Sequence, residues 1–298
     1  MAKPRLAADY DDDITAASRS ALAEVMITLG AYRDALVLIG GWAPYLILER
    51  FGEPGGFQGE TFQVDASQAG PVHVGSIDID LVVDPDVVDA EHYATIVERL
   101  LERGWARALE SRFQFQKETL SPRSGRPHLI RIDLLTPKPL PRQGRERRHR
   151  PVQRDLEARA LEGAEVALGH WFWYEIEAPL ADGAVARAAV KVADVVAMLA
   201  LKGFAIGECY AEKDAYDIYM LCAHHAGGPR AVAERLRPAR DEAPVRRGLA
   251  AIAEKFRAEE AEGPTWVARF FSPAGAHEFE RLRLDAFMTI QEVLRLSG

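Results

Sequence analysis

Hydrophobic residues recur with two different periods up to about residue 190. Residues 13–30 carry them at helical spacing, which predicts an amphipathic helix. Residues 112–118 and 128–135 alternate between apolar and polar positions, as half-buried strands do. Short apolar runs at 35–40 and 76–84 predict buried strands. Further helices are predicted at 42–50 and 87–104, and further short strands at 164–177.

Beyond about residue 190 the pattern is helical throughout. Helices are predicted at 191–206, 211–225, 228–236, 243–258 and 276–296. Strands and helices that mix first, followed by helices alone, predict an α+β protein with a mixed sheet in its N-terminal domain and an all-helical C-terminal domain. We expect the N-terminal domain to span residues 1–188 and the helical domain residues 189–298.

Composition narrows the class of protein. The chain has 298 residues, is 48% hydrophobic and carries a net charge of -8, so bulk charge does not predict nucleic-acid binding. Its two cysteines, Cys209 and Cys222, form no metal-ligand pattern and suit a reducing compartment. We find no signal-peptide pattern at the start and no apolar run long enough to span a bilayer. These features predict a cytoplasmic protein without a membrane partner.

Two stretches carry candidate chemistry, "LIGGWAPYLI" at 38–47 and "GSIDIDLVVD" at 75–84. A strand that ends in Gly40 and Gly41 and turns into a helix offers free backbone N–H groups to a phosphate. In the second stretch Asp78 and Asp80 are expected on one face of a strand, opposite the isoleucines. Two carboxylates this close favour a cation between them, and Mg²⁺ with nucleotide phosphates is the simplest one.

The two stretches in this order resemble the signature of the nucleotidyltransferase superfamily, whose fold is that of DNA polymerase β. The resemblance implies a third metal-binding carboxylate on a later strand, which "LIRIDLL" supplies as Asp133. It implies two Mg²⁺ ions held by Asp78, Asp80 and Asp133, and an NTP whose phosphates lie against Gly40, Gly41 and Ser76. The chain departs from the family in the long gap before Asp78, which an insertion around 52–72 explains. His73 could contact phosphate or be an ordinary loop histidine.

A second constellation lies in the helical part. Lys202 falls on one predicted helix, and Lys213, Asp214 and Asp217 fall on the next, with Lys213 and Asp217 four residues apart on one face. A solvated, ion-paired helix surface would explain this spacing. The pattern also resembles the C-terminal motif of AbiEii/AbiGii-type nucleotidyltransferases, the toxins of type IV toxin–antitoxin and abortive-infection systems. That resemblance implies that Lys202 and Lys213 bind phosphates, and that Lys202 and Asp217 take part in catalysis in the same cleft as Asp78.

The resemblance implies transfer of a nucleoside monophosphate from an NTP to an RNA, such as a tRNA, or to a protein, and a cognate antitoxin as a partner. Two alternatives stay open, a non-catalytic module that binds nucleotide or a partner, and a small-molecule nucleotidyltransferase of the antibiotic-modifying kind. Two further runs have a functional and a structural interpretation. The aromatic run 171–174 could stack bases or pack as strand. The basic loop could bind RNA or triphosphate or be solvated, and its basic residues are Arg142, Arg145, Arg147, Arg148, His149 and Arg150.

Overall fold

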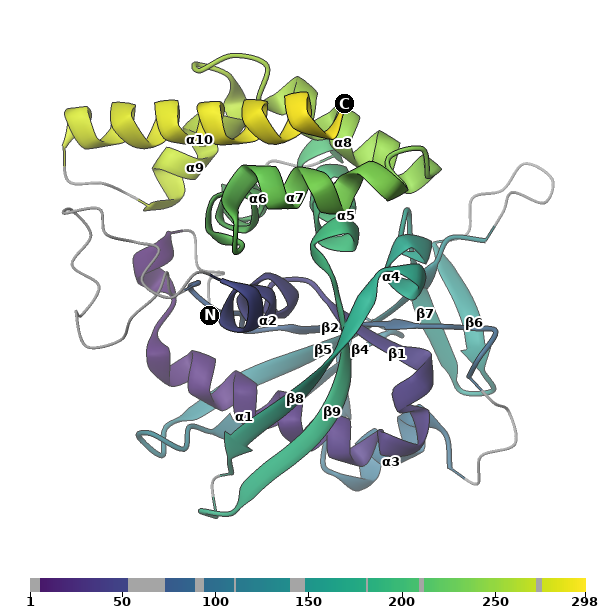
Figure 1. Cartoon of the computed structure of the whole chain (residues 1–298). Coiled ribbons are helices and arrows are strands. Elements are labelled where there is room, and N and C mark those ends of the chain that lie inside the picture. The colour runs from purple at the N-terminus through teal and green to yellow at the C-terminus, as the bar shows by residue number, and fades with distance from the viewer. Residues whose placement is uncertain are drawn as a thin grey trace. The chain divides into compact units, whose positions relative to one another are not determined.

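A computed structural model describes residues 6–52, 73–88, 94–109, 111–139, 148–180, 182–208, 212–271 and 275–298. Within these ranges the chain is an α+β protein, as predicted, with a mixed sheet first and packed helices last (Figure 1). Most of the expected insertion, Cys209 and the basic-loop residues Arg142, Arg145 and Arg147 lie outside the described residues.

The chain divides into two compact units. The sheet unit consists of Tyr10–Ala43 and Gly75–Asp194, and the helical unit of Met1–Asp9, Pro44–Val74 and Val195–Gly298. Most of helix α2, together with His73 and Val74, therefore belongs with the C-terminal helices, although these residues come early in the sequence.

The described residues of the sheet unit form one nine-stranded mixed sheet. Its main path runs β3-β4-β5-β2-β1-β9-β8, and β7 extends it by pairing with both β5 and β6. Strand β2 is antiparallel to β1 and parallel to β5, so it joins the two halves of the sheet. The strands are β1 (Leu36–Ile39), β2 (Ile79–Val83), β3 (Ala106–Arg107), β4 (Gln114–Leu120), β5 (Pro127–Pro137), β6 (His149–Gln153), β7 (Leu156–Leu161), β8 (Trp171–Pro179) and β9 (Val185–Ala193).

Helix α1 (Asp12–Thr28) covers one face of this sheet. Lys117 of β4 binds Glu24 of α1 at 2.7 Å, and His128 of β5 contacts Asp13 of α1 at 2.8 Å. Because side chains alternate along a strand, the face that carries Lys117 and His128 also carries the buried residues Ile130 and Ile132. The alternate residues of β5, Leu129, Arg131 and Asp133, point to the opposite face of the sheet.

The other helices of the sheet unit are short. They are α3 (Ile96–Glu102) and α4 (Glu165–Gly169), with the 3-10 segment η2 (Gly30–Ala35) between α1 and β1. Helix α2 (Trp42–Phe51) begins in the sheet unit and continues in the helical unit. The remaining segments of the helical unit are η1 (Ala7–Asp9), α5 (Val195–Glu208), α6 (Glu212–His224), α7 (Gly228–Leu236), η3 (Arg237–Ala239), α8 (Ala243–Lys255), α9 (Glu262–Phe271) and α10 (Ala276–Ser297).

Helices α5 and α8 approach each other closely through two glycines. A Cβ on Gly203 would lie 2.2 Å from the carbonyl oxygen of Gly248, and a Cβ on Gly248 would lie 2.4 Å from that of Ala200. Only glycine lets the two backbones meet at this distance. None of the helices within the described ranges is long and apolar enough to cross a membrane.

Several predicted boundaries are wrong. The helix expected from residue 87 begins at Ile96, because Thr95 and Glu98 form a capping box that starts a helix there. Part of the strand expected at 164–177 is helix α4, and the aromatic run 171–174 opens β8. The helix expected from 191 begins at Val195, because the preceding residues extend β9. Helix α9 was not predicted.

The N-terminus of α1 is fixed to the β4–β5 hairpin through Asp13. Its carboxylate accepts hydrogen bonds from the hydroxyls of Ser121 at 2.5 Å and Ser124 at 2.7 Å, besides the contact with His128. Ser121, followed by His128 and Ser124, lowers the pKa of Asp13 to about 2. The ionised form is therefore favoured in the folded protein.

A carboxyl group with a lowered pKa stabilises the fold above its ordinary pKa, and that contribution is lost as the pH falls toward the lowered value. We expect the free energy of unfolding to drop between about pH 4 and pH 2 in the parent protein and to drop less in Asp13→Asn. Urea unfolding across this range measures both. Asp12→Asn is the matched control, since Asp12 is an exposed neighbour paired with Arg123. Equal pH dependence in Asp13→Asn and the parent would contradict this role.

Candidate functional site

The strand register places two predicted metal ligands side by side. Asp80 of β2 pairs with Asp133 of β5 in the parallel register, and Ile39 of β1 pairs with Asp80 on the other side. Paired residues on neighbouring strands point to the same face and lie about 5 Å apart. Both aspartates are half-buried and lie on the face opposite α1. The sheet unit thus brings two carboxylates together from segments more than fifty residues apart in sequence.

The Gly-Gly turn lies directly against Asp80. Gly40 has a φ of +69°, and a Cβ added to it would lie 1.9 Å from Oδ2 of Asp80. The carboxylate therefore occupies the space that any other residue at position 40 would fill. Gly41 is buried and precedes the first turn of α2, whose Trp42 donates a hydrogen bond to Ser18 of α1 at 3.0 Å. The requirement for glycine that the sequence indicated thus has a local cause in Asp80.

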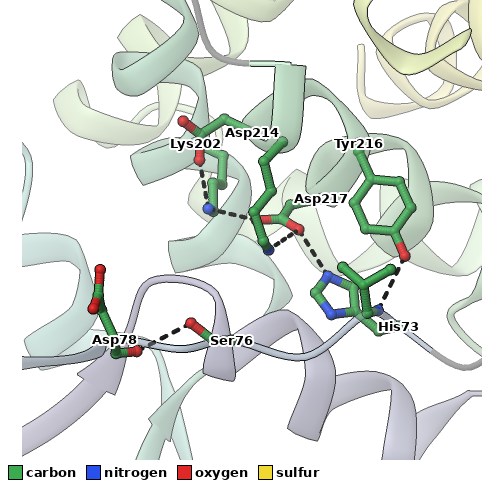
Figure 2. A network of polar contacts seen from close by, with 9 residues as sticks. His73, Ser76, Asp78, Lys202, Asp214, Tyr216 and Asp217 are labelled. Atoms are coloured by element: carbon green, nitrogen blue, oxygen red, sulfur yellow. Dashed lines mark hydrogen bonds and ion pairs between the residues drawn. The ribbon is translucent and has the colours of Figure 1, made fainter. Parts of the chain in front are cut away.

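Asp78 and Ser76 lie in the segment that enters β2. The predicted strand contained Asp78, but β2 begins at Ile79 and Asp78 lies in a bend. The hydroxyl of Ser76 donates to the carbonyl oxygen of Asp78 at 3.0 Å and so stabilises this bend (Figure 2). Ser18 donates likewise to the carbonyl of Ile77 at 2.9 Å. The approach to β2 is therefore held by side-chain hydroxyls instead of strand pairing.

Asp133 has a neighbour that the sequence did not reveal. Gln114 of β4 is paired with Asp133 in the antiparallel register, and its side-chain amide donates to Oδ1 of Asp133 at 2.7 Å. Gln114 belongs to no motif, and only the register of β4 against β5 shows that it meets Asp133. The contact orients one carboxylate oxygen and leaves the other for a further ligand.

The donor set suits Mg²⁺ in kind, since Mg²⁺ prefers carboxylate oxygens and retains water. Asp80 and Asp133 lie on adjacent strands, and Asp78 precedes Asp80 by two residues. Within the described part of the chain, no three His, Cys, Asp or Glu side chains are arranged as a ready metal site. A metal ion bound by all three aspartates would therefore require their side chains to turn toward one another.

The helical unit contains a buried cluster of charges, shown in Figure 2. Lys202 of α5 lies between two carboxylates of α6, with its ammonium 2.5 Å from Asp214 and 2.6 Å from Asp217. Lys213 binds Asp217 at 3.0 Å, and His73 meets the same carboxylate at 2.7 Å. Asp217 is fully buried, whereas the side chain of Lys213 is 22% exposed. We call these five residues the α6 cluster.

The charges of the α6 cluster balance. Burial would raise the pKa of Asp217, but Lys202 and Lys213 outweigh burial and hold that pKa below its usual range. Burial lowers the pKa of Lys213 and opposes the charged form of Lys202, but Asp214 and Asp217 raise the pKa of Lys202. Two ammonium groups thus face two carboxylates.

His73 completes the cluster in its neutral form. Burial lowers the pKa of His73 to about 4, although Asp217 opposes this shift. Because an ionised carboxylate can only accept, Nε2 of the neutral ring carries the hydrogen that binds Asp217. The hydroxyl of Tyr216 accepts from the backbone N–H of Val74 at 3.3 Å, so α6 holds both residues of this segment.

The sequence grouped Lys202, Lys213, Asp214 and Asp217 as one constellation, and these side chains do meet, but the sequence did not indicate that His73 joins them. His73 lies 144 residues from Asp217 along the chain, and no local pattern announces their contact. Lys202 and Asp217 belong to the helical unit, whereas Asp78 belongs to the sheet unit. Their expected meeting in one cleft therefore stays a prediction.

Comparison of the chain with protein-family models, with curated proteins and with solved structures gives no match.

The contact between Gly40 and Asp80 predicts a specific cost of substitution. Gly40→Ala should be destabilised by about 1–2 kcal/mol for its left-handed backbone and further for displacing Asp80. Gly125→Ala is the matched control, because Gly125 has a φ of +72° but nothing within 4 Å of an added Cβ. Chemical unfolding of the two variants separates the cost of the left-handed backbone from the cost of displacing Asp80. Equal losses would mean that Asp80 does not occupy the space beside Gly40.

A buried neutral histidine predicts a pH dependence of its own. Because the pKa of His73 is lowered, the unfolded chain binds a proton between about pH 6.5 and 4 that the folded chain does not bind. The free energy of unfolding therefore decreases as the pH is lowered from about 6.5 to 4. His73→Gln should remove this part of the fall, on the order of 3 kcal/mol. The free energy of unfolding at several pH values is the measurement, with His277→Gln on the exposed start of α10 as control. A fall unchanged in His73→Gln would show that His73 titrates normally.

Proposed function

We propose that the protein is a Mg²⁺-dependent nucleotidyltransferase, which moves a nucleoside monophosphate from an NTP to an acceptor and releases pyrophosphate. The observation that carries this proposal is the group formed by Asp80, Asp133 and the Gly40–Gly41 turn. Two carboxylates lie in register on neighbouring strands, and a glycine turn that leads into a helix lies against one of them. Carboxylates for a cation and backbone N–H groups for phosphate are the two requirements of this reaction.

The sheet unit would bind the nucleotide. Asp78, Asp80 and Asp133 would hold two Mg²⁺ ions, which would supply positive charge to stabilise the attacking and leaving oxygens. Gly40, Gly41 and Ser76 would contact the phosphates through backbone N–H groups and a hydroxyl. The amide of Gln114 orients Asp133, so that its other oxygen is available to the metal or to the proton of the acceptor.

The helical unit would supply positive charge. Lys213 is the more exposed of the two cluster lysines, and Lys202 lies deeper between Asp214 and Asp217. A triphosphate that approached the cluster would compete with these carboxylates for the lysines. Only residues 74–77 separate His73, held by Asp217, from Asp78. A role of the α6 cluster in the same reaction is part of this proposal and rests on the resemblance of its motif.

The resemblance to AbiEii/AbiGii-type enzymes extends the proposal to an RNA or protein acceptor, to a cognate antitoxin and to the cytoplasm. A non-catalytic module of the same fold would bind nucleotide and release no pyrophosphate. An antibiotic-type enzyme would label a small molecule. Incubation with each labelled NTP, Mg²⁺, total RNA and cell lysate distinguishes these outcomes by the material that acquires label.

Removal of one carboxylate should abolish transfer without loss of folding. Asp80→Asn and Asp133→Asn should each lower the transfer rate by about a hundredfold or more, because the metal-bound charge is lost. Both variants should be at least as stable as the parent without metal, since like charges on paired strands repel each other. Transfer assays and thermal unfolding measure the two effects.

A second measurement makes this prediction independent of turnover. Mg²⁺ should raise the unfolding temperature of the parent, because a ligand that binds only the folded state stabilises it, and should raise that of Asp80→Asn less. Asp86→Asn removes the same charge from an exposed position beyond β2 and should behave like the parent. Parental transfer by Asp80→Asn would remove the site assignment.

A further inference from the structure

A stacked group of three side chains lies beside the carboxylates of the sheet unit. The rings of Phe113 and His149 are 5.6 Å apart and tilted by 32°. The guanidinium carbon of Arg159 lies 5.9 Å from the centre of the Phe113 ring. Phe113 directly precedes β4, His149 opens β6 and Arg159 lies on β7. We call this group the Phe113 stack.

Arg159 is available to an anion. It is exposed, and within the described part of the chain no ion pair of its guanidinium is found besides its position over the Phe113 ring. By contrast, Arg112, which precedes Phe113 in the chain, is paired with Glu157 at 2.9 Å. Residues 148–161 hold four arginines against two acidic residues, in a chain whose net charge is -8. Positive charge is therefore concentrated on the β6–β7 hairpin.

The register places the Phe113 stack next to Asp133. Arg159 pairs with Leu135 of β5, and Asp133 lies two residues earlier on the same strand, so both point to one face. His149 pairs with Arg159 and shares that face. Two residues along a strand and one strand across give about 8 Å between the backbones of Asp133 and Arg159. The backbone carbonyl of Phe113 accepts from the N–H of Leu134 at 2.9 Å, which fixes the stack at this end of β5.

We propose that the Phe113 stack binds the acceptor of the reaction and that the acceptor is single-stranded RNA. This inference rests on the proposed function and names its second substrate. Arg159 would bind a backbone phosphate, and Phe113 with His149 would stack on a base. A cation beside flat rings is the combination by which proteins hold single-stranded nucleic acid without reading its sequence.

The geometry favours RNA over the other acceptors. A protein acceptor would need complementary side chains, and it has no base that would stack on a ring. A small antibiotic would need an enclosed site, whereas Arg159 is exposed on a strand pair at the edge of the sheet. The triphosphate itself already has the Gly40–Gly41 turn, which lies on the other side of β2 from β5.

The test is RNA binding in the absence of NTP, so that it does not depend on turnover. A fluorescein-labelled, mixed-sequence RNA of about twelve nucleotides is titrated with protein at several salt concentrations, and its anisotropy gives Kd. Arg159→Ala should raise Kd about tenfold and lower the salt slope by about one. Phe113→Leu, which keeps an apolar side chain but no ring, should raise Kd about tenfold, and Phe113→Tyr should keep the parental value.

Two controls separate this inference from its alternatives. Arg126→Ala removes an exposed arginine just before the start of β5, far from Leu135 and Arg159, and should leave the Kd for RNA unchanged. Binding of a fluorescent NTP should be the same in Arg159→Ala and the parent. The inference would be overturned if Arg159→Ala bound RNA as tightly as Arg126→Ala does. It would also be overturned if Arg159→Ala lost affinity for NTP and kept its affinity for RNA. RNA binding through the stack without any transfer would refute the proposed function alone.

Discussion

The position of β2 between β1 and β5 is the constraint on which the candidate site depends. A shift of one residue in either pairing would turn Asp80 into the core and move it away from both Gly40 and Asp133. The register is fixed by the other face of the strand, where Ile79, Leu81 and Val83 are fully buried. Burial of these residues thus holds the aspartate in place, although none of them touches a substrate.

The charged side chains of the two units have different neighbours. In the helical unit, the α6 cluster pairs two lysines with two carboxylates and lets a neutral histidine donate the remaining hydrogen bond. Such a cluster is stable without any ligand, because each buried charge has a partner. In the sheet unit, Asp80 and Asp133 are adjacent carboxylates, so a cation that binds there gains attraction from both. A metal dependence is therefore expected of the sheet unit and not of the α6 cluster.

Local patterns in the sequence predicted the fold class, the glycine turn and the two aspartates on β2 and β5, because strand alternation and turn chemistry are short-range properties. Contacts across the chain were not predictable in the same way. Gln114 reaches Asp133 through strand register, and His73 reaches Asp217 across a segment that carries little pattern. The late start of α3 shows a further limit. Apolar positions continue upstream of Thr95 in the sequence, but the capping box of Thr95 and Glu98 sets the point where the helix begins. Side-chain caps can thus override periodicity.

In the proposed function, the two substrates would lie on opposite sides of strand β5. On one side of it lie β2 and β1, with Asp80 and the Gly40–Gly41 turn, and on the other lie β4 and β7, with Gln114, Phe113 and Arg159. Asp133 stands between the two groups. An in-line displacement needs the attacking oxygen and the leaving phosphates on opposite sides of the phosphorus. A nucleotide held on the β1–β2 side and an acceptor held on the β4–β7 side would meet this requirement over Asp133. If the proposed function is correct, the sheet order would separate donor from acceptor, and the basic β6–β7 hairpin would lie on the acceptor side.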